Sequence, residues 1–281
     1  MTAFARRVRA QSGETAADAP SHAVALVHQR PLPYLYLARQ VLGAYGISWQ
    51  AVDALPLAAE PWAAAVDLVL TFAASDASRA AGLALLASPL LVPPPRGDAG
   101  DAAPPVTAGG IEACDRELAD ALFVGGRARL AELDARWRDD AGAGRARVQR
   151  RRALPVMDAL LRAADALEPL ATLDRASVQL DRLEGFLIAA ERIPGAPRAR
   201  ERHLRARGAV LGLLRRAREA YRRFGDPAIA IDELAPLLRR LMEAQTFSPR
   251  VGPGLVHVVD AAAAAFGRFA DVTLAGLIES E

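Results

Sequence analysis

The sequence predicts a predominantly helical α/β protein in which a parallel sheet is interrupted by a long all-α insertion. Alanine supplies much of the 52% hydrophobic content while aromatic residues make up only 5%, a composition that favours closely packed helices. Short apolar runs rich in Val and Leu lie near the two ends of the chain. The long stretch between them keeps helical spacing, with no strand signal.

The amino-terminal part is expected to begin with a βαβ unit. Residues 1–21 are polar, small and rich in turn formers, which predicts a flexible lead-in. An apolar run at 23–27 is followed by a helical stretch at 34–44 and a second strand within "YGISWQAV". Strand, helix and strand in such a short stretch predict parallel strands joined by a right-handed crossover.

Two helices and a linker are predicted next. The first begins near Pro61, because a proline in the first helical turn loses no hydrogen bond. The second is expected at 78–87, and the Pro- and Gly-rich segment 93–110 reads as a flexible linker. The apolar positions of the first helix recur at helical spacing: Trp62, Val66, Val69 and Leu70.

The sequence divides into two domains on this interpretation. A helical insertion is predicted at 111–250, with breaks at the segments "GAG", "RIPGAP" and "GDP". Strands resume at 255–259 and 272–277. We therefore expect one α/β domain made of 22–92 together with 251–281, in which the opening and closing strands lie side by side.

Composition excludes several kinds of chemistry. All 35 basic residues are arginine, so a Walker A lysine and Schiff-base lysine chemistry are excluded within this chain. The single cysteine, Cys114, forms no internal disulfide, and the four histidines lack metal-ligand spacing, so no metal site is predicted. Without a signal peptide or a membrane-length apolar run, a cytoplasmic protein with no membrane partner is expected.

The order of elements resembles the second motor domain of superfamily 1 DNA helicases of the UvrD and RecB type, and especially the helicase-like nuclease subunit AddB. In that family a strand carrying an arginine, a helix, a "GI" strand, a "PL" turn and two helices ending at "SPL" follow one another. The terminal "VHVVDAAAAAFGRFADVTLAGLIESE" resembles the family's strand, Gly-containing loop and strand before "GL.EGE.P". The matching segments are "VALVHQR", "YLYLARQVLGAYGI", "LPL", "PWAAAVDLVLTFA" and "GLALLASPLL".

The resemblance implies a RecA-like (P-loop NTPase-like) sheet of the 2A type, interrupted by a helical insertion of the 2B type. It also implies a DNA-binding part in an ATP-dependent helicase and nuclease that serves DNA repair and recombination. The implied partners are single-stranded or forked DNA and the remaining helicase or nuclease segments or a partner subunit. ATP and Mg²⁺ are implied for the complete family protein, and no cofactor is expected in this chain.

The chain departs from the family's pattern in the loop after the penultimate strand. An active helicase carries a threonine, a histidine and a lysine there, whereas this chain has Asp260, Ala262 and Ala265. The Walker segments would lie before residue 1, and the final arginine motif and any nuclease domain after residue 281. We therefore expect a piece of a larger protein or a degenerate relative, with no catalytic residue and no activity alone.

Two arginines are candidates for sensing a nucleotide. Arg30 follows the first strand, near the position of the family's nucleotide-sensing arginine, and its alternative role is to cap the sheet edge in solvent. Arg268 stands beside Gly267 in the loop before the last strand, where AddB-like proteins carry an arginine and a glycine.

Two arginine clusters are candidates for binding nucleic acid, because guanidinium groups can release the counterions of a phosphate backbone. The stretch 197–225 holds ten arginines against two glutamates, and "RARVQRRR" lies beside glycines in an expected loop. The alternative is a solvated helix face, with Val210, Leu211 and Leu214 turned toward the core. The candidates are Arg150, Arg151, Arg152, Arg198, Arg202, Arg205, Arg215, Arg218 and Arg222.

Other notable side chains have structural interpretations. His203 is expected at the surface, and His257 is expected on the sheet face opposite Val256 and Val258. Trp62 and Trp137 occupy helical apolar positions and are expected in the core.

Two functional hypotheses result from the sequence. The first is a non-catalytic, DNA-engaging segment of an AddB-like or UvrD-like helicase and nuclease. The alternative is a stand-alone α/β protein with a helical domain that acts as an interaction or regulatory module without binding DNA. Salt-sensitive binding of DNA distinguishes the two.

Overall fold

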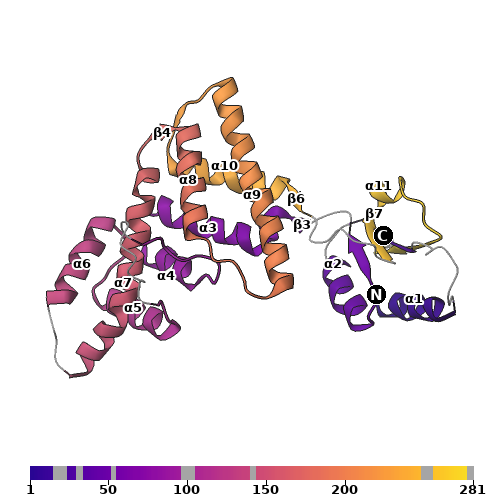
Figure 1. Ribbon diagram of the computed structural model, residues 1–281, viewed down its shortest axis with the longest axis horizontal. Coiled ribbons are helices and arrows are strands. Elements are labelled where there is room, and N and C mark those ends of the chain that lie inside the picture. Colours follow the sequence, from indigo (N-terminus) through magenta and orange to yellow (C-terminus); the bar gives the residue numbers. More distant parts are fainter. Residues whose placement is uncertain are drawn as a thin grey trace, which may run out of the picture. The chain divides into compact units, whose positions relative to one another are not determined.

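In the computed structural model the chain forms two compact units (Figure 1). The sheet unit combines Met1–Leu57 with Ala244–Glu281, and the helical unit is Ala58–Glu243. The structure describes residues 1–14, 24–29, 34–51, 55–95, 105–139, 144–247 and 256–276.

The sheet unit is built on a four-stranded sheet in which every strand pair is parallel. Val24 of the first strand lies opposite both Val256 and Asp271, so this strand sits between the last two. The prediction that the opening and closing strands lie side by side in one sheet is therefore confirmed. Across the sheet the strands are β2 (Trp49–Ala51), β7 (Val256–Asp260), β1 (Val24–His28) and β8 (Asp271–Ala275).

One face of this sheet is covered by helices. They are α1 (Thr2–Glu14), α2 (Tyr34–Leu37) and the π-helical turn η1 (Ala38–Leu42). A strand buried on both faces needs a continuous apolar run, and all five residues of β1 are buried. The core on this face contains Phe4, Ala5, Val8, Val24, Leu26, Leu35, Leu42, Val256 and Val258.

The prediction of a flexible lead-in over 1–21 was wrong for its described part. Residues 2–14 form α1, and Phe4, Ala5 and Val8 are buried against the sheet. These three residues share one helix face, but arginines and small residues surround them and make the pattern faint. The helix is therefore held by tertiary packing. Residues 15–21 lie outside the described residues.

The opposite face of the sheet carries a smaller core. Ala25, Val27 and Val259 are buried there, with Ala264 of the short helix α11 (Ala261–Ala264) and Phe269 packed against them. The chain thus passes from β1 to β2 by way of helices on one face, and from β7 to β8 by way of α11 on the other. A short antiparallel pair, β3 (Leu55–Pro56) with β6 (Thr246–Phe247), completes the unit.

The helical unit follows the predicted breaks closely. The short turn η2 (Leu57–Ala59) leads into the first helix, which begins at Pro61 as expected. The helices are α3 (Pro61–Ala74), α4 (Arg79–Ala87), α5 (Ala108–Asp120), α6 (Arg127–Asp139), α7 (Gly144–Ala171), α8 (Ala176–Ala190), α9 (Pro197–Phe224) and α10 (Ile231–Ala244).

The core of the helical unit is apolar and closely packed. Trp62 and Trp137 are buried in it, as predicted. Cys114 is buried beside Leu118 and Met157, and removal from water, reinforced by Asp115 and Glu117, raises the pKa of its thiol to about 12. Such a thiol is protonated at neutral pH and is a poor nucleophile.

The boundary between the units lies earlier than the predicted one at residue 92. Helices α3 and α4 belong to the helical unit because their apolar faces are buried among its other helices. A Cβ atom at Gly82 of α4 would lie 2.7 Å from Leu160 of α7 and 2.9 Å from Phe72 of α3. This close approach needs glycine and fixes α4 against both neighbours.

Two further expectations for this region differ from the structure. The end of the predicted linker 93–110 forms the start of α5, where Thr107 accepts a hydrogen bond from the Gly110 amide. Residues 96–104 of that linker lie outside the described residues. The predicted all-α insertion also contains a small antiparallel ladder, β4 (Asp174–Arg175) with β5 (Ala228–Ile229). Pairs of two residues are too short for a strand pattern in the sequence.

Across the residues that the structure covers, no helix is both long enough and apolar enough to span a bilayer.

Pairing of β1 with β7 predicts energetic coupling between Leu26 and Val258, which are register partners in one core. Leu26→Ala should lower the free energy of unfolding by about 2–5 kcal/mol. Combined with Val258→Ala it should deviate from additivity by at least about 0.5 kcal/mol in urea denaturation. Leu118→Ala, in the helical unit, is the control and should add to Leu26→Ala. Strict additivity of Leu26 with Val258 would contradict the pairing.

Candidate nucleic-acid interface

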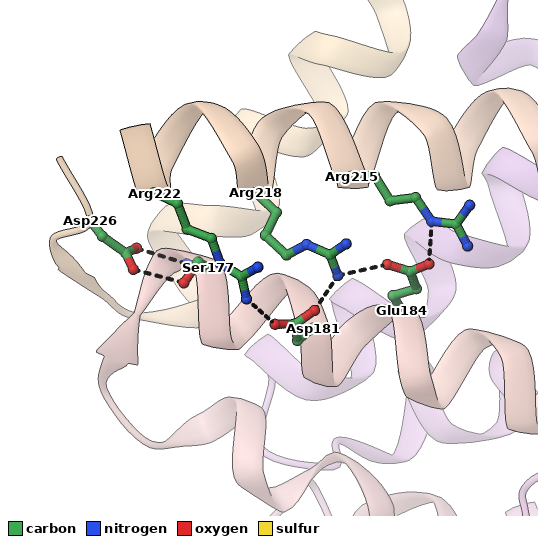
Figure 2. A network of polar contacts seen from close by, with 7 residues as sticks. All are labelled: Ser177, Asp181, Glu184, Arg215, Arg218, Arg222 and Asp226. Atoms are coloured by element: carbon green, nitrogen blue, oxygen red, sulfur yellow. Dashed lines mark hydrogen bonds and ion pairs between the residues drawn. The ribbon is translucent and has the colours of Figure 1, made fainter. Parts of the chain in front are cut away.

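The arginine row at the carboxyl-terminal half of α9 faces α8 (Figure 2). Arg215, Arg218 and Arg222 are spaced to share one side of the helix, as predicted. Arg215 donates to Glu184 at 2.6 Å, and Arg222 donates to Asp181 at 2.8 Å. Arg218 lies between them and binds both carboxylates, Asp181 through one short hydrogen bond and Glu184 at 3.1 Å.

This network of three arginines and two carboxylates joins α8 to α9. The Glu184 side chain is only 10% exposed, and the two guanidinium groups that bind it take the place of water around its carboxylate. Beneath the network, apolar residues of the two helices are buried, including Leu180, Leu183, Leu187, Val210, Leu211 and Leu214. The positive charge of this row is thus largely compensated inside the helical unit.

The segment after α9 caps the start of α8. Asp226 accepts hydrogen bonds from the backbone amide of Ser177 at 2.9 Å and from its hydroxyl at 2.7 Å (Figure 2). These bonds lower the pKa of the Asp226 carboxyl. A carboxylate at this place satisfies an amide that has no partner within the helix, so Asp226 acts as a cap supplied from a distant part of the chain.

The amino-terminal half of α9 carries a second set of paired arginines. Arg202 forms a two-pronged pair with Glu60, with both hydrogen bonds at 2.7 Å, and the Glu60 side chain is 1% exposed. Arg205 is partly buried one turn further along α9. The side chain of Arg198 lies outside the described residues. Arg202 therefore ties α9 to the start of α3.

The surface position predicted for His203 was wrong, since this residue is 6% exposed. Its Nε2 lies 2.7 Å from a Glu191 oxygen, Arg207 donates to the other oxygen at 2.7 Å, and Trp62 meets the imidazole edge-on. The sequence held a signal for this burial. His203 lies about two helical turns before Val210, so both residues belong to the buried face of α9.

The other arginine cluster was expected in a loop, but it forms the first turns of α7. Arg150 pairs with Glu117 of α5 at 3.3 Å, whereas Arg147, Arg151 and Arg152 are exposed. Within the described residues, no carboxylate lies at ion-pair distance from these three side chains. They form a basic surface at one end of the helical unit, which we name the α7 arginine surface.

Of the two nucleotide-sensing candidates, the structure describes only Arg268. Arg30 lies outside the described residues, while Arg268 is exposed in the loop between α11 and β8. Arg268 belongs to the sheet unit, and the α7 arginine surface belongs to the helical unit.

Polar and aromatic side chains lie at the carboxyl ends of the parallel strands. His28 and Asp260 end β1 and β7 and are register partners. Because the chain leaves these two strands toward opposite faces, this is the kind of position where parallel sheets bind ligands. Here the Tyr34 ring is stacked with His28 at 5.9 Å, and a Cβ atom on Gly276 would lie 2.4 Å from the Tyr34 hydroxyl. Tyr34 therefore packs closely against the end of β8.

His257 lies on the sheet face opposite Val256 and Val258, as predicted. The Gln50 amide nitrogen lies 2.8 Å from its Nδ1, and Phe269 meets the ring edge-on. Burial lowers the pKa of His257. The neutral imidazole is thus favoured in the folded state.

Five of the candidate arginines are therefore paired with carboxylates, while Arg151 and Arg152 are exposed on α7. No cluster of three or more His, Cys, Asp or Glu side chains suited to a metal ion occurs in the described parts of the chain. The sequence matches no protein-family model and no curated protein.

The α8–α9 network predicts a measurable loss of stability on removal of Arg218. Arg218→Ala leaves Glu184 with one partner, and we expect the free energy of unfolding to fall by about 1–3 kcal/mol, between the values for exposed and buried pairs. Arg200→Ala, on the exposed start of α9, should change it by less than about 0.5 kcal/mol. Urea denaturation measures both. Equal effects of the two changes would contradict a clamping role.

The lowered pKa of His257 predicts a pH-dependent stability. As the pH falls below the ordinary value of 6.5, the unfolded chain binds a proton on this group before the folded chain does. The free energy of unfolding should therefore decrease with falling pH from 6.5 down to the folded pKa. His257→Gln should reduce this slope in urea denaturations at a series of pH values, and an unchanged slope would contradict the assignment.

Proposed function

We propose that the chain is a DNA-engaging, non-catalytic segment of an ATP-dependent helicase and nuclease of the UvrD or AddB type, acting in DNA repair and recombination in the cytoplasm. The observation that carries the proposal is the sheet assembled from both ends of the chain, with the whole helical unit inserted between β2 and β7. This is the arrangement that the resemblance implies for a 2A-type domain with a 2B-type insertion.

The α7 arginine surface is the part of the helical unit best suited to touch DNA. Arg147, Arg151 and Arg152 are exposed and have no carboxylate partner among the described residues, so a phosphate backbone can replace their counterions. The α9 row is less suited, because binding DNA there would require breaking pairs with Asp181 and Glu184. Nucleotide hydrolysis and strand cleavage would be supplied by segments or partners outside this chain, which would hold ATP and Mg²⁺.

The test is fluorescence anisotropy of the full chain with labelled single-stranded and forked DNA over a series of salt concentrations. The affinity should fall steeply with salt. Replacing Arg147, Arg151 and Arg152 together by Gln should weaken binding and reduce the slope of log K against log salt by about 2 on single-stranded DNA, at about 0.7 per contact.

A matched control removes the same charge elsewhere. Arg200, Arg223 and Arg240 are exposed on α9 and α10, and their joint replacement by Gln should leave the salt slope almost unchanged. Equal losses in the two triple variants would show diffuse attraction and would contradict the α7 assignment. Absence of salt-sensitive binding by the unmodified chain would overturn the DNA role.

The alternative function, an interaction or regulatory module without DNA binding, is favoured by one observation. Five of the nine arginines that the sequence offers for DNA contact are held by carboxylates of the same unit: Arg150, Arg202, Arg215, Arg218 and Arg222. On this alternative, the anisotropy titration shows no binding at low salt although the chain is folded. The two functions are therefore separated by the same measurement.

A further inference from the structure

The sheet face that carries Ala25 and Val27 continues onto β8 as an exposed apolar surface. In the parallel register, Ala25 lies beside Val272 and Val27 beside Leu274, so these β8 side chains share that face. Ala25 and Val27 are buried, whereas Val272 is 51% exposed and Leu274 is 58% exposed. The apolar strip thus begins in the core and ends in solvent.

The two faces of this sheet differ in how they are covered. The face of Leu26 and Val258 packs against α1, α2 and η1, and Arg7 of α1 bonds with Thr273 and Asp271 of β8 on that side. On the other face, the described cover is the four-residue helix α11 and Phe269. Parallel sheets in proteins are covered on both faces, whereas among the described residues no other element packs on Val272 and Leu274 from this side.

The loop before β8 carries an exposed aromatic side chain and an exposed charge. Phe269 packs on this face, and a Cβ atom on Gly267 would lie 2.1 Å from its ring, so the loop needs glycine to close over it. Phe266, just before, is 92% exposed. Arg268 is exposed in the same loop, and no described carboxylate pairs with it. We name Phe266, Val272 and Leu274 with Arg268 the open face.

We propose that the open face binds an amphipathic helix of a partner protein. The helix would present apolar side chains at i, i+3 or i+4, and i+7 to Phe266, Val272 and Leu274, and an acidic side chain to Arg268. This inference is independent of DNA binding, since it involves the sheet unit and neither of the arginine clusters on α7 and α9.

The size and charge of the open face favour a helix over a second copy of the chain. A stable interface between globular proteins buries about 800 Å² on each partner, which three side chains do not supply, whereas a helix typically uses a few such anchors. A two-fold contact through this face would also bring two Arg268 side chains to the rim of one small interface. Single-stranded nucleic acid fits less well, because aliphatic Val272 and Leu274 are not stacking platforms and Arg268 alone is a weak phosphate site.

The probes are two labelled peptides of roughly 18 residues, or five helical turns. Both carry Leu at i, i+3 and i+7. One is flanked by Glu and the other by Lys. Fluorescence anisotropy with the full chain should show tighter binding of the Glu-flanked peptide, and Arg268→Glu should reverse the order. Leu274→Asn should weaken binding of the Glu-flanked peptide tenfold or more.

The control for exposed leucine is Leu122→Asn in the helical unit. Leu122 is 87% exposed, and its φ of 52° is one that asparagine tolerates, so this change should leave peptide binding unaltered. Urea denaturation should show that Leu274→Asn leaves folding intact, because the side chain is more than half exposed.

Three outcomes would overturn the proposal. One is that neither peptide binds, or that both bind the Leu274→Asn chain as they bind the unmodified one. Another is a dimer in sedimentation that Leu274→Asn dissolves, which would make a second copy the occupant. The third is a loss of stability on Leu274→Asn as large as that of a core substitution, which would show that the chain itself covers the face.

Discussion

The position of β1 between β7 and β8 is the constraint on which the sheet unit depends. Val24 pairs with Val256 and Asp271, so the first strand has its neighbours only when the end of the chain is present. An interior strand has a neighbour on each side, and β1 is buried along its whole length, so its burial depends on both neighbours. The helical unit lies in the long connection between β2 and β7 and is formed by one continuous segment of the chain. Closing this connection adds an entropic cost to that of ordering the residues of the sheet.

The helical unit uses arginine mainly as a structural residue. All Lys and Arg positions are arginine, and a planar guanidinium group can bind a carboxylate through two parallel hydrogen bonds. Arg202 binds Glu60 in this way, with both hydrogen bonds at 2.7 Å. Glu60, Glu184 and Glu191 are buried carboxylates that α9 compensates along its length. Removing one partner of such a pair leaves the other charge buried and poorly solvated. Packings of the helices that separate the two partners are therefore disfavoured. Arg147, Arg151 and Arg152 on α7 are exposed, with no carboxylate partner among the described residues.

Much of the local structure was predictable because short-range rules decide it. Pro61 begins α3, Ser78 caps α4, and the breaks at "RIPGAP" and "GDP" separate α8, α9 and α10. The candidate site was predictable only as a set of residue types. The shared face of Arg215, Arg218 and Arg222 follows from helix periodicity, but their carboxylate partners lie on α8, outside any local window. The burial of His203 was not predicted, because the arginines around it indicated a solvent-exposed stretch. Its spacing of two helical turns from the buried Val210 was the signal that pointed to the core.

The sequence by itself determined the fold class, the main helices and the parallel strands near both ends, since apolar periodicity and proline and glycine positions act within a few residues. It also determined that no lysine-dependent chemistry occurs in this chain. Only the tertiary structure decided that α1 covers the sheet, that α3 and α4 belong to the helical unit, and which arginines are neutralised. The physical reason is that burial and charge compensation depend on neighbours from distant parts of the chain, whose approach no local pattern records.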